Sequence, residues 1–313
     1  MFEQVIKAIR EYDRIIIHRH KTPDGDALGS QIGLKHILME NFPGKEILVT
    51  GDGAGRYGFM DDCGMDMIPD EAYHNALAVI LDTSARHLIS DERYTMAKKT
   101  LRIDHHIFCE KIADIEVTDT SYESCCGLIA ELAMEQGLRL TPVAAKSLYT
   151  GMVTDSGRFR YDATTANTFR LAAFLMQQSF DINTIYDNLY ADDFDRIQNK
   201  ARFVLKIRRT ERPVAYIYTT LEEVKALNMD TFSISRGMVG TMSDIRGIDI
   251  WVNFTETETG VLCELRSSKY NINPIAVRYG GGGHAKASGA TVKDRDTAMA
   301  MLRDLECLTE EMQ

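Results

Sequence analysis

Residues 18–30 read HRHKTPDGDALGS and directly follow the apolar run III of residues 15–17. This segment places one imidazole and two carboxylates, those of His20, Asp24 and Asp26, in a seven-residue window. Such side chains, released at the end of a buried strand, can face one point in space and suit divalent metal ions. The segment therefore predicts a metal site at the edge of a sheet.

The first half of the chain alternates short apolar runs with helical patterns. This alternation predicts a doubly wound α/β domain over residues 1–190, with a parallel sheet covered by helices on both faces. Ligands of such sheets gather beyond the carboxyl ends of the strands. The expected strands are Arg14–His18, Ile47–Thr50, Leu77–Leu81 and Leu101–Ile103, and the expected helices include Ser30–Asn41, Cys126–Gln136, 141–152 and 164–178.

A smaller α+β domain is expected over residues 209–313, after a charged helical linker at 191–208. Its predicted strands are Val214–Thr219, Ile248–Phe254 and Val261–Arg266, followed by a helix at Asp294–Leu305. The segment Gly51–Gly58 of the first domain is rich in glycine but has no phosphate-loop pattern, so we interpret it as a loop.

Composition excludes several classes of protein. The net charge is −10, from 36 basic and 46 acidic side chains, which argues against a protein that grips long duplex DNA. No apolar run approaches the roughly 18 residues of a membrane-spanning helix. The six cysteines show no zinc or redox spacing, and we expect reduced thiols in a cytoplasmic protein. The oligomeric state stays open.

Three further clusters of acids and histidines come after the first one. Asp82 comes after one predicted strand, Asp104-His105-His106 after the next, and Asp155 lies in a TDSG sequence. Each has a simpler explanation, since Asp82 could cap a helix and adjacent histidines on a strand point to opposite faces. Four clusters together favour a metal site.

The ligand types indicate which metal ions and which chemistry to expect. Two ions roughly 3.5–4 Å apart can share a carboxylate and activate water for attack on phosphorus. Mixed imidazole and carboxylate ligands favour Mn²⁺ over Mg²⁺ or Ca²⁺, with Zn²⁺ as an alternative. We expect two divalent metal ions and phosphoester hydrolysis.

A second signal lies near the end of the chain, where Gly280–Gly283 precede His284. A glycine run lets the backbone approach a phosphate closely, although a plain surface turn would look the same. Residues 266–289 contain four cations and no acid, which predicts an anion-binding stripe. Arg266 could hold a phosphate with two hydrogen bonds, or it could form an ordinary surface salt bridge.

These motifs resemble the signature of the DHH phosphoesterase superfamily and of its associated C-terminal GGGH domain. The resemblance implies one metal held by His20, Asp24 and Asp82, and a second held by Asp26, Asp82, His105 and Asp155. It also implies that His106 lies near the substrate phosphate and that Asp104 supports the histidines. The residues that it implies for substrate binding are Arg266, Ser267, Gly281, Gly282, Gly283 and His284.

The most similar branch consists of stand-alone oligoribonucleases, some of which also act on 3′-phosphoadenosine 5′-phosphate (pAp). The resemblance thus implies short single-stranded RNA or dinucleotides as substrates, cut to mononucleotides. One departure is Gly127, where the branch often has an acid, and it leaves substrate choice open. The alternatives are a cyclic-dinucleotide phosphodiesterase, a manganese-dependent pyrophosphatase and a non-enzymatic nucleotide sensor.

Overall fold

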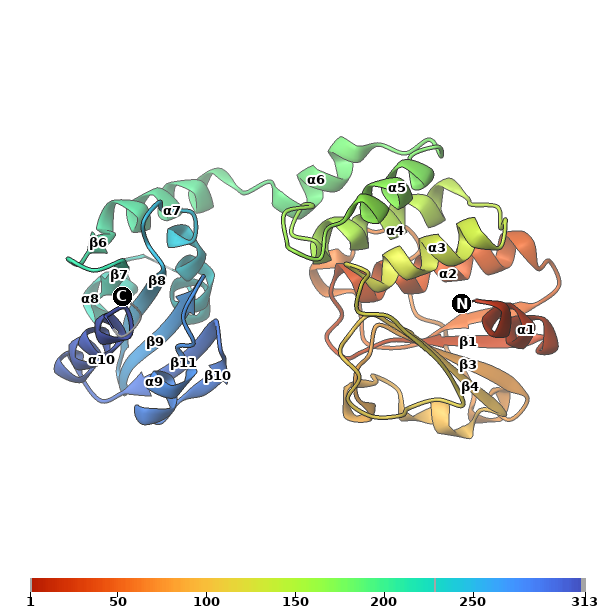
Figure 1. The fold of residues 1–313 in the computed structure, drawn as a ribbon, viewed down its shortest axis with the longest axis horizontal. Coiled ribbons are helices and arrows are strands. Elements are labelled where there is room, and N and C mark those ends of the chain that lie inside the picture. The colour runs from red at the N-terminus through yellow and green to blue at the C-terminus, as the bar shows by residue number, and fades with distance from the viewer. Residues whose placement is uncertain (1, 228, 311–313) are drawn as a thin grey trace. The chain divides into compact units, whose positions relative to one another are not determined.

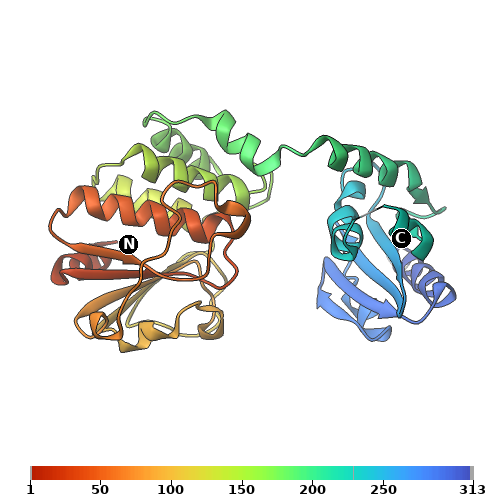
Figure 2. The same cartoon turned by 180° about the vertical axis from the view of Figure 1, so that it is seen from behind.

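The computed structural model describes residues 2–227 and 229–310, so the outer ends of the two expected domains lie outside the described residues. The chain divides into two compact units, Met1–Ala191 and Asp192–Gln313 (Figures 1 and 2). The expected linker region contains α7 (Phe194–Lys206) and the short strand β6 (Arg208–Arg209), and both are grouped with the second unit.

The first unit is built on a five-stranded sheet in the order β2-β1-β3-β4-β5, and all of its neighbours pair in parallel. The predicted parallel sheet is confirmed. The last strand was missed by the sequence analysis because only one of its four residues is buried. The strands are β1 (Arg14–His18), β2 (Glu46–Val49), β3 (Ala76–Leu81), β4 (Lys99–Asp104) and β5 (Ile115–Thr118).

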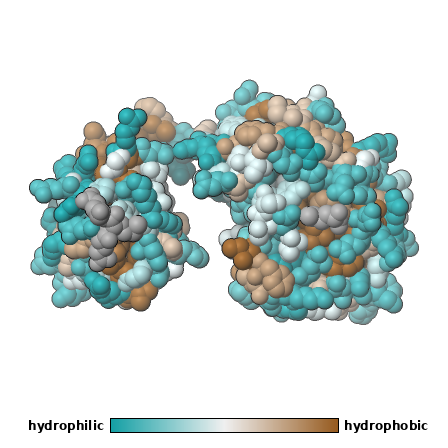
Figure 3. All heavy atoms as spheres, in the orientation of Figure 1, coloured by the Kyte–Doolittle hydropathy of each residue, from teal (hydrophilic) through white to brown (hydrophobic). Residues whose placement is uncertain are grey.

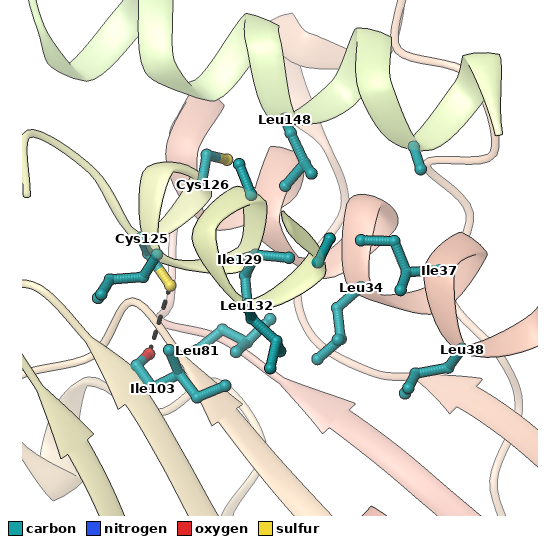
Figure 4. Close-up of a cluster of buried hydrophobic side chains, with 14 of the residues drawn as sticks. Leu34, Ile37, Leu38, Leu81, Ile103, Cys125, Cys126, Ile129, Leu132 and Leu148 are labelled. Atoms are coloured by element: carbon teal, nitrogen blue, oxygen red, sulfur yellow. Dashed lines mark hydrogen bonds between the residues drawn. The ribbon is translucent and has the colours of Figure 1, made fainter. Parts of the chain in front are cut away.

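The two faces of this sheet are covered differently. Ile15 and Ile17 pack with the α-helices in one large core, part of which Figure 4 shows between the strands and α2, α3 and α4. Ile16 faces the other way and packs with Tyr73, beside short 3₁₀ helices such as Asp70–Ala72. The α-helices are α1 (Glu3–Glu11), α2 (Gly25–Asn41), α3 (Cys125–Glu135), α4 (Pro142–Asp155), α5 (Ala166–Leu175) and α6 (Ile182–Tyr190).

Helix α2 begins at Gly25, so the expected start at Ser30 is wrong. Asp24 caps this helix, because its Oδ1 accepts hydrogen bonds of 3.0 Å from the backbone nitrogens of Asp26 and Ala27. The consequence for the site is direct. Asp26 stands on the first turn of a helix instead of in a loop, and its side chain is fixed relative to β1.

Glycines set the separation of α4 from α2 and α3. A Cβ at Gly29 would lie 2.5 Å from the carbonyl oxygen of Ser147, and one at Gly151 would lie 2.2 Å from Cys126 Sγ. Both distances are too short for real atoms, so only glycine allows this packing. Because α2 carries Asp26 and α4 ends at Asp155, the close packing brings these two carboxylates together.

The second unit contains a six-stranded mixed sheet in the order β10-β11-β9-β8-β7-β6. Only β7 and β8 pair in parallel among its described strands. The predicted α+β class is confirmed, and the last two glycines of the run form an edge strand together with His284. The elements are β7 (Val214–Thr219), α8 (Leu221–Ala226), β8 (Ile250–Thr257), β9 (Gly260–Ser267), α9 (Asn273–Arg278), β10 (Gly282–His284), β11 (Ala287–Val292) and α10 (Arg295–Leu308).

The surface seen in Figure 3 is mostly hydrophilic, with hydrophobic side chains in small groups. None of the described helices has the length and apolar character needed to cross a membrane. The six cysteines form no disulfide, and Cys125 and Cys126 are buried.

The packing of α2 on α4 yields a stability prediction. We expect Gly29→Ala to lower the free energy of unfolding by about 1–3 kcal/mol, because the added methyl group meets a backbone carbonyl that cannot rotate away. Denaturation followed by far-UV circular dichroism measures this. Gly64→Ala is the matched control, since no described atom lies within 4 Å of its Cβ position. Equal stability of Gly29→Ala and the wild type would contradict the account.

Candidate metal and phosphate site

The strand order creates one position at which ligands can collect. The chain leaves β1 for β2 on one side and later returns to β3 on the other side of β1, so the loops beyond β1 and β3 diverge. His20 and Asp24 come after β1, Asp82 after β3, and His105 after β4. Three of the four sequence clusters therefore meet at one edge of the sheet.

Asp82 lies at the centre of this cluster and is 2% exposed. Its Oδ2 is 3.4 Å from His20 Nε2, and its Oδ1 is 3.5 Å from His105 Nε2. Its φ of +49° belongs to the left-handed region, which turns the side chain away from the path of the strand. Asp82 caps no helix, since the next helical turn is preceded by Ala85, so the capping explanation is wrong.

Asp26 is held by the amino end of α3. Its two carboxylate oxygens accept hydrogen bonds from the backbone nitrogens of Cys125 and Cys126, at 2.7 and 2.8 Å. A helix amino terminus stabilises negative charge, so α3 supports a carboxylate that is 1% exposed. The adjacent cysteines thus contribute backbone donors. Sequence reasoning missed this role, because the donors lie about a hundred residues from Asp26 and any residue type except proline supplies them.

The predicted ligands fall into overlapping groups whose donor atoms lie within 4.8 Å of one another. One group is His20, Asp24 and Asp82, and another is Asp26, His105 and Asp155. A third joins Asp82 and His105 with His106, which the resemblance implied to be a phosphate neighbour. All six predicted metal ligands are therefore brought together in the first unit.

Asp104 orients His106 from beneath the site. Its Oδ1 lies 2.7 Å from His106 Nδ1, and its Oδ2 accepts a hydrogen bond from Arg102. Asp104 and Arg102 are both fully buried, so this ion pair is shielded from water. Arg102 was not predicted. A lone arginine in an apolar strand was the available signal, because a buried arginine needs a buried partner.

Electrostatics show that the arrangement fits cations. Burial alone lowers the pKa of His20, but contact with Asp24 and Asp82 raises this pKa to about 11. Burial likewise opposes charge on His105, while Asp82 and Asp26 raise its pKa to about 10. Burial raises the pKa of Asp155 to about 6. The neighbouring carboxylates thus keep His20 and His105 protonated. The positive charge of the imidazoles compensates the negative charge of the cluster, and a bound cation could do the same.

An unsatisfied atom supports the same conclusion. Asp82 Oδ1 is buried and accepts no hydrogen bond among the described residues, although His105 Nε2 and His106 Nδ1 each lie 3.5 Å from it. Such an atom is costly unless something binds it, and a divalent ion between imidazole and carboxylate ligands would do so. The residues therefore fit divalent metal ions.

In the second unit, the predicted cations are largely paired. Arg266 Nη1 is 3.2 Å from Glu264 Oε2, Lys269 Nζ is 2.9 Å from Asp249 Oδ1, and Arg278 is 2.9 Å from Asp304. These acids lie outside residues 266–289, so counting charge along the sequence overstated the positive charge of the stripe. Glu264, two residues before Arg266 on β9, supplies the salt bridge that the sequence analysis held as an alternative.

Two of the glycines next to His284 are required by the β10–β11 pairing. A Cβ at Gly281 would lie 2.0 Å from the carbonyl oxygen of Gly289, and Gly283 has a φ of +132°. Gly282, by contrast, has no described atom within 4 Å of its Cβ position, and His284 is exposed. Gly283 and His284 are exposed and Gly282 is half-buried, so Gly282 is the glycine of this strand with room for a side chain, and His284 offers an accessible imidazole.

Ser267 already has hydrogen-bond partners. Its hydroxyl donates to the carbonyl oxygen of Asp249 at 3.0 Å and accepts from the backbone nitrogen of Tyr270 at 2.7 Å. It is 5% exposed. Ser267 thus fixes the turn after β9, next to Arg266.

The chain is similar to known proteins in sequence and in fold. A family model described as the DHH family, N-terminal domain, matches residues 14–152, and one described as the DHHA1 domain matches residues 216–311. The chain is 34% identical over 314 residues to the bifunctional oligoribonuclease and PAP phosphatase NrnA of Bacillus subtilis, covering 99% of both chains. The protein belongs to the DHH family.

Two further similar proteins are informative. The cyclic-di-AMP phosphodiesterase GdpP of Geobacillus thermodenitrificans is 27% identical, but the match covers 91% of this chain and only 46% of that protein. The crystal structure of an exopolyphosphatase-related protein from Bacteroides fragilis superposes with a TM-score of 0.81 at 24% identity. It covers 97% of this chain and 94% of that chain, which shows a common fold.

The departure at Gly127 has a structural counterpart in this DHH protein. A Cβ at Gly127 would lie 2.7 Å from Glu123 Oε1. Glu123 is 3% exposed and accepts hydrogen bonds from the hydroxyls of Ser124 and Thr168, at 3.0 and 2.8 Å. A carboxylate therefore does lie beside the first turn of α3, and it comes from residue 123.

The central position of Asp82 is testable without any assay of turnover. We expect Mn²⁺ to raise the melting temperature of the wild type and to leave that of Asp82→Asn nearly unchanged, because the variant loses the carboxylate charge at the centre of the cluster. Asp62→Asn is the matched control, since Asp62 also has a positive φ of +54° and pairs with Lys35 away from the site. A full Mn²⁺ shift in Asp82→Asn would disprove the central role.

Metal binding should also release protons near neutral pH. His20 and His105, with pKa values of about 11 and about 10, are protonated in the metal-free chain and must be neutral to bind an ion. Titration calorimetry with Mn²⁺ in buffers of different ionisation enthalpy measures this release. We expect the apparent heat to vary with the buffer, and identical heats in all buffers would rule the release out.

Proposed function

We propose that this DHH protein is a metal-dependent phosphoesterase that hydrolyses short single-stranded oligoribonucleotides to mononucleotides and also removes a phosphate from pAp. The observation that carries this proposal is the buried, unsatisfied Oδ1 of Asp82, set among imidazoles and carboxylates. Full-length similarity to a bifunctional oligoribonuclease and PAP phosphatase supports the choice of substrate.

The proposed cofactor is a pair of divalent ions, and the mixed imidazole and carboxylate ligands favour Mn²⁺. His20 and Asp24 would hold one ion, and Asp26, His105 and Asp155 would hold the other, with Asp82 shared between them. Bound divalent ions supply positive charge to a phosphate group and lower the pKa of water.

His106 is suited to contact the substrate. Its Nδ1 is hydrogen-bonded to Asp104, a contact that raises the pKa of the imidazole, and its side chain is 45% exposed. The other ring nitrogen, Nε2, is left to donate a hydrogen bond to a phosphate oxygen, where negative charge increases as the bond to phosphorus forms. Asp104 and Arg102 keep the ring in that orientation.

In the second unit, we propose that Arg266 and His284 bind substrate phosphate. Gly282 offers its backbone beside them, while Gly281 and Gly283 maintain the strand pairing and Ser267 holds the turn. Arg266 is only partly exposed and must share its guanidinium between Glu264 and a phosphate. The unpaired cysteines agree with a cytoplasmic location, which we propose as well.

A cyclic-dinucleotide phosphodiesterase is the second candidate, favoured by the similarity to GdpP over 91% of this chain. It would use the same metal site. A sensor without activity is less consistent with the site, because all six expected ligands are present.

A product assay with Mn²⁺ separates these candidates. We expect mononucleotides to appear fastest from RNA of two to five nucleotides, with phosphate released from pAp and slower turnover of cyclic diadenylate and pyrophosphate. Excess EDTA should abolish all of it. Preferred turnover of cyclic diadenylate would favour the second candidate, and no turnover by the metal-loaded protein would favour a sensor.

Substrate binding by Arg266 has its own test. We expect Arg266→Ala to raise KM for short RNA about 10-fold or more and to leave metal content unchanged, because a charge-assisted contact contributes about 1.5–3 kcal/mol. Arg278→Ala is the matched control, since Arg278 is more exposed and pairs with Asp304. Unchanged kinetics in Arg266→Ala would remove this residue from the binding site.

A further inference from the structure

A cavity of about 510 Å³ lies beside Asp24 in the first unit. Asp24 is the one predicted metal ligand among the residues that line it. One wall consists of Thr22, Pro23 and Asp24, which come after β1. The opposite wall is residues 52–57, part of the glycine-rich segment for which the sequence offered no role. Because Asp24 lines this cavity and is also one of the predicted metal ligands, the cavity adjoins the metal site.

Hydrogen bonds fix the two walls to each other. The backbone nitrogen of Thr22 donates to Asp52 Oδ2 at 2.7 Å, and the fully buried Arg19 donates to the carbonyl oxygen of Asp52. Tyr57 is 5% exposed and packs with Leu28 and other side chains of α2. These contacts make the cavity a preformed feature of the fold.

The lining combines small apolar residues with a few polar and charged groups. Pro23 and Ala54 supply apolar surface, and Gly53 and Gly55 leave open space, since neither has a described atom within 4 Å of its Cβ position. Apolar walls with a few polar groups and a volume of roughly 300–1,000 Å³ are typical of small-ligand pockets. A wall of small residues leaves room for a planar base.

Arg56 adds a positive charge at this cavity. Its guanidinium lies 4.8 Å from the centre of the Tyr57 ring and donates to the Tyr57 hydroxyl at 2.6 Å. No described carboxylate forms an ion pair with Arg56, in contrast to Arg266. Since the chain has a net charge of −10, an arginine without an acidic partner beside a metal ligand favours an anionic ligand such as phosphate.

We propose that this cavity binds the nucleoside that adjoins the scissile phosphate, with the base against Pro23 and Ala54 and a phosphate oxygen on Arg56. This assignment rests on the proposed function and adds a site for substrate recognition to it. It makes the glycine-rich segment a determinant of specificity for nucleotides over simple phosphate esters.

The test is a binding measurement with a dinucleotide whose linkage is a non-hydrolysable methylenephosphonate, in the presence of Mn²⁺. Gly53→Leu fills the cavity without strain on the backbone. We expect the Kd of this variant for the dinucleotide to be about 10-fold or more higher than that of the wild type, which is the effect of losing one base contact. Gly64→Leu is the matched control, because Gly64 is equally unobstructed but lies outside the cavity.

An abasic version of the same ligand shows whether the base is recognised. Gly53→Leu should bind it as the wild type does, whereas Arg56→Ala should weaken binding of both ligands through the lost phosphate contact. The cavity assignment would be overturned if Gly53→Leu bound the dinucleotide with wild-type affinity. It would also be overturned if Gly53→Leu weakened binding of the dinucleotide and of the abasic ligand equally. If the wild type neither binds nor hydrolyses the dinucleotide, the proposed function itself fails.

Discussion

The burial of Asp82 between two imidazoles is the interaction on which the rest of the site depends. One carboxylate oxygen lies near His20, and the other lies near His105 without a hydrogen-bond partner among the described residues. The carboxyl groups of Asp24, Asp26 and Asp155 lie in the same small volume. Such a cluster is unfavourable unless positive charge compensates it, and this requirement explains both the raised pKa values of the histidines and the fit to divalent ions.

Neighbouring elements stabilise this charge and fix its geometry. The amino end of α3 supports Asp26, and the buried Arg102 supports Asp104, which in turn orients His106. The close packing of α2 on α4 through Gly29 fixes the positions of the carboxylates carried by those two helices. These contributions come from residues other than the predicted metal ligands, and small changes in them would alter the site.

Much of this arrangement could be predicted from the sequence. The central strands are short apolar runs, and a parallel sheet gathers the residues after its strands at one edge, so the metal ligands were recognisable from their spacing. Contacts between distant segments were not. The amide donors of Cys125 and Cys126, the partner of Arg102 and the acid next to Arg266 all depend on pairing in three dimensions.

The glycine run shows the same limit from another direction. Gly281 and Gly283 are glycines because β11 lies too close for a side chain, a reason that appears only with the sheet. The cavity beside Asp24 could not be predicted from the sequence for a similar reason. Its two walls are far apart in sequence and are held together by a hydrogen bond from Arg19 to Asp52.

The central claim is that Asp82 is shared by two metal ions. The most direct measurement is electron paramagnetic resonance of the protein at saturating Mn²⁺. Two Mn²⁺ ions bridged by one carboxylate are magnetically coupled, so the account predicts a multi-line spectrum that collapses to isolated-ion signals in Asp82→Asn. A wild-type spectrum that shows only isolated Mn²⁺ ions at full loading would contradict it.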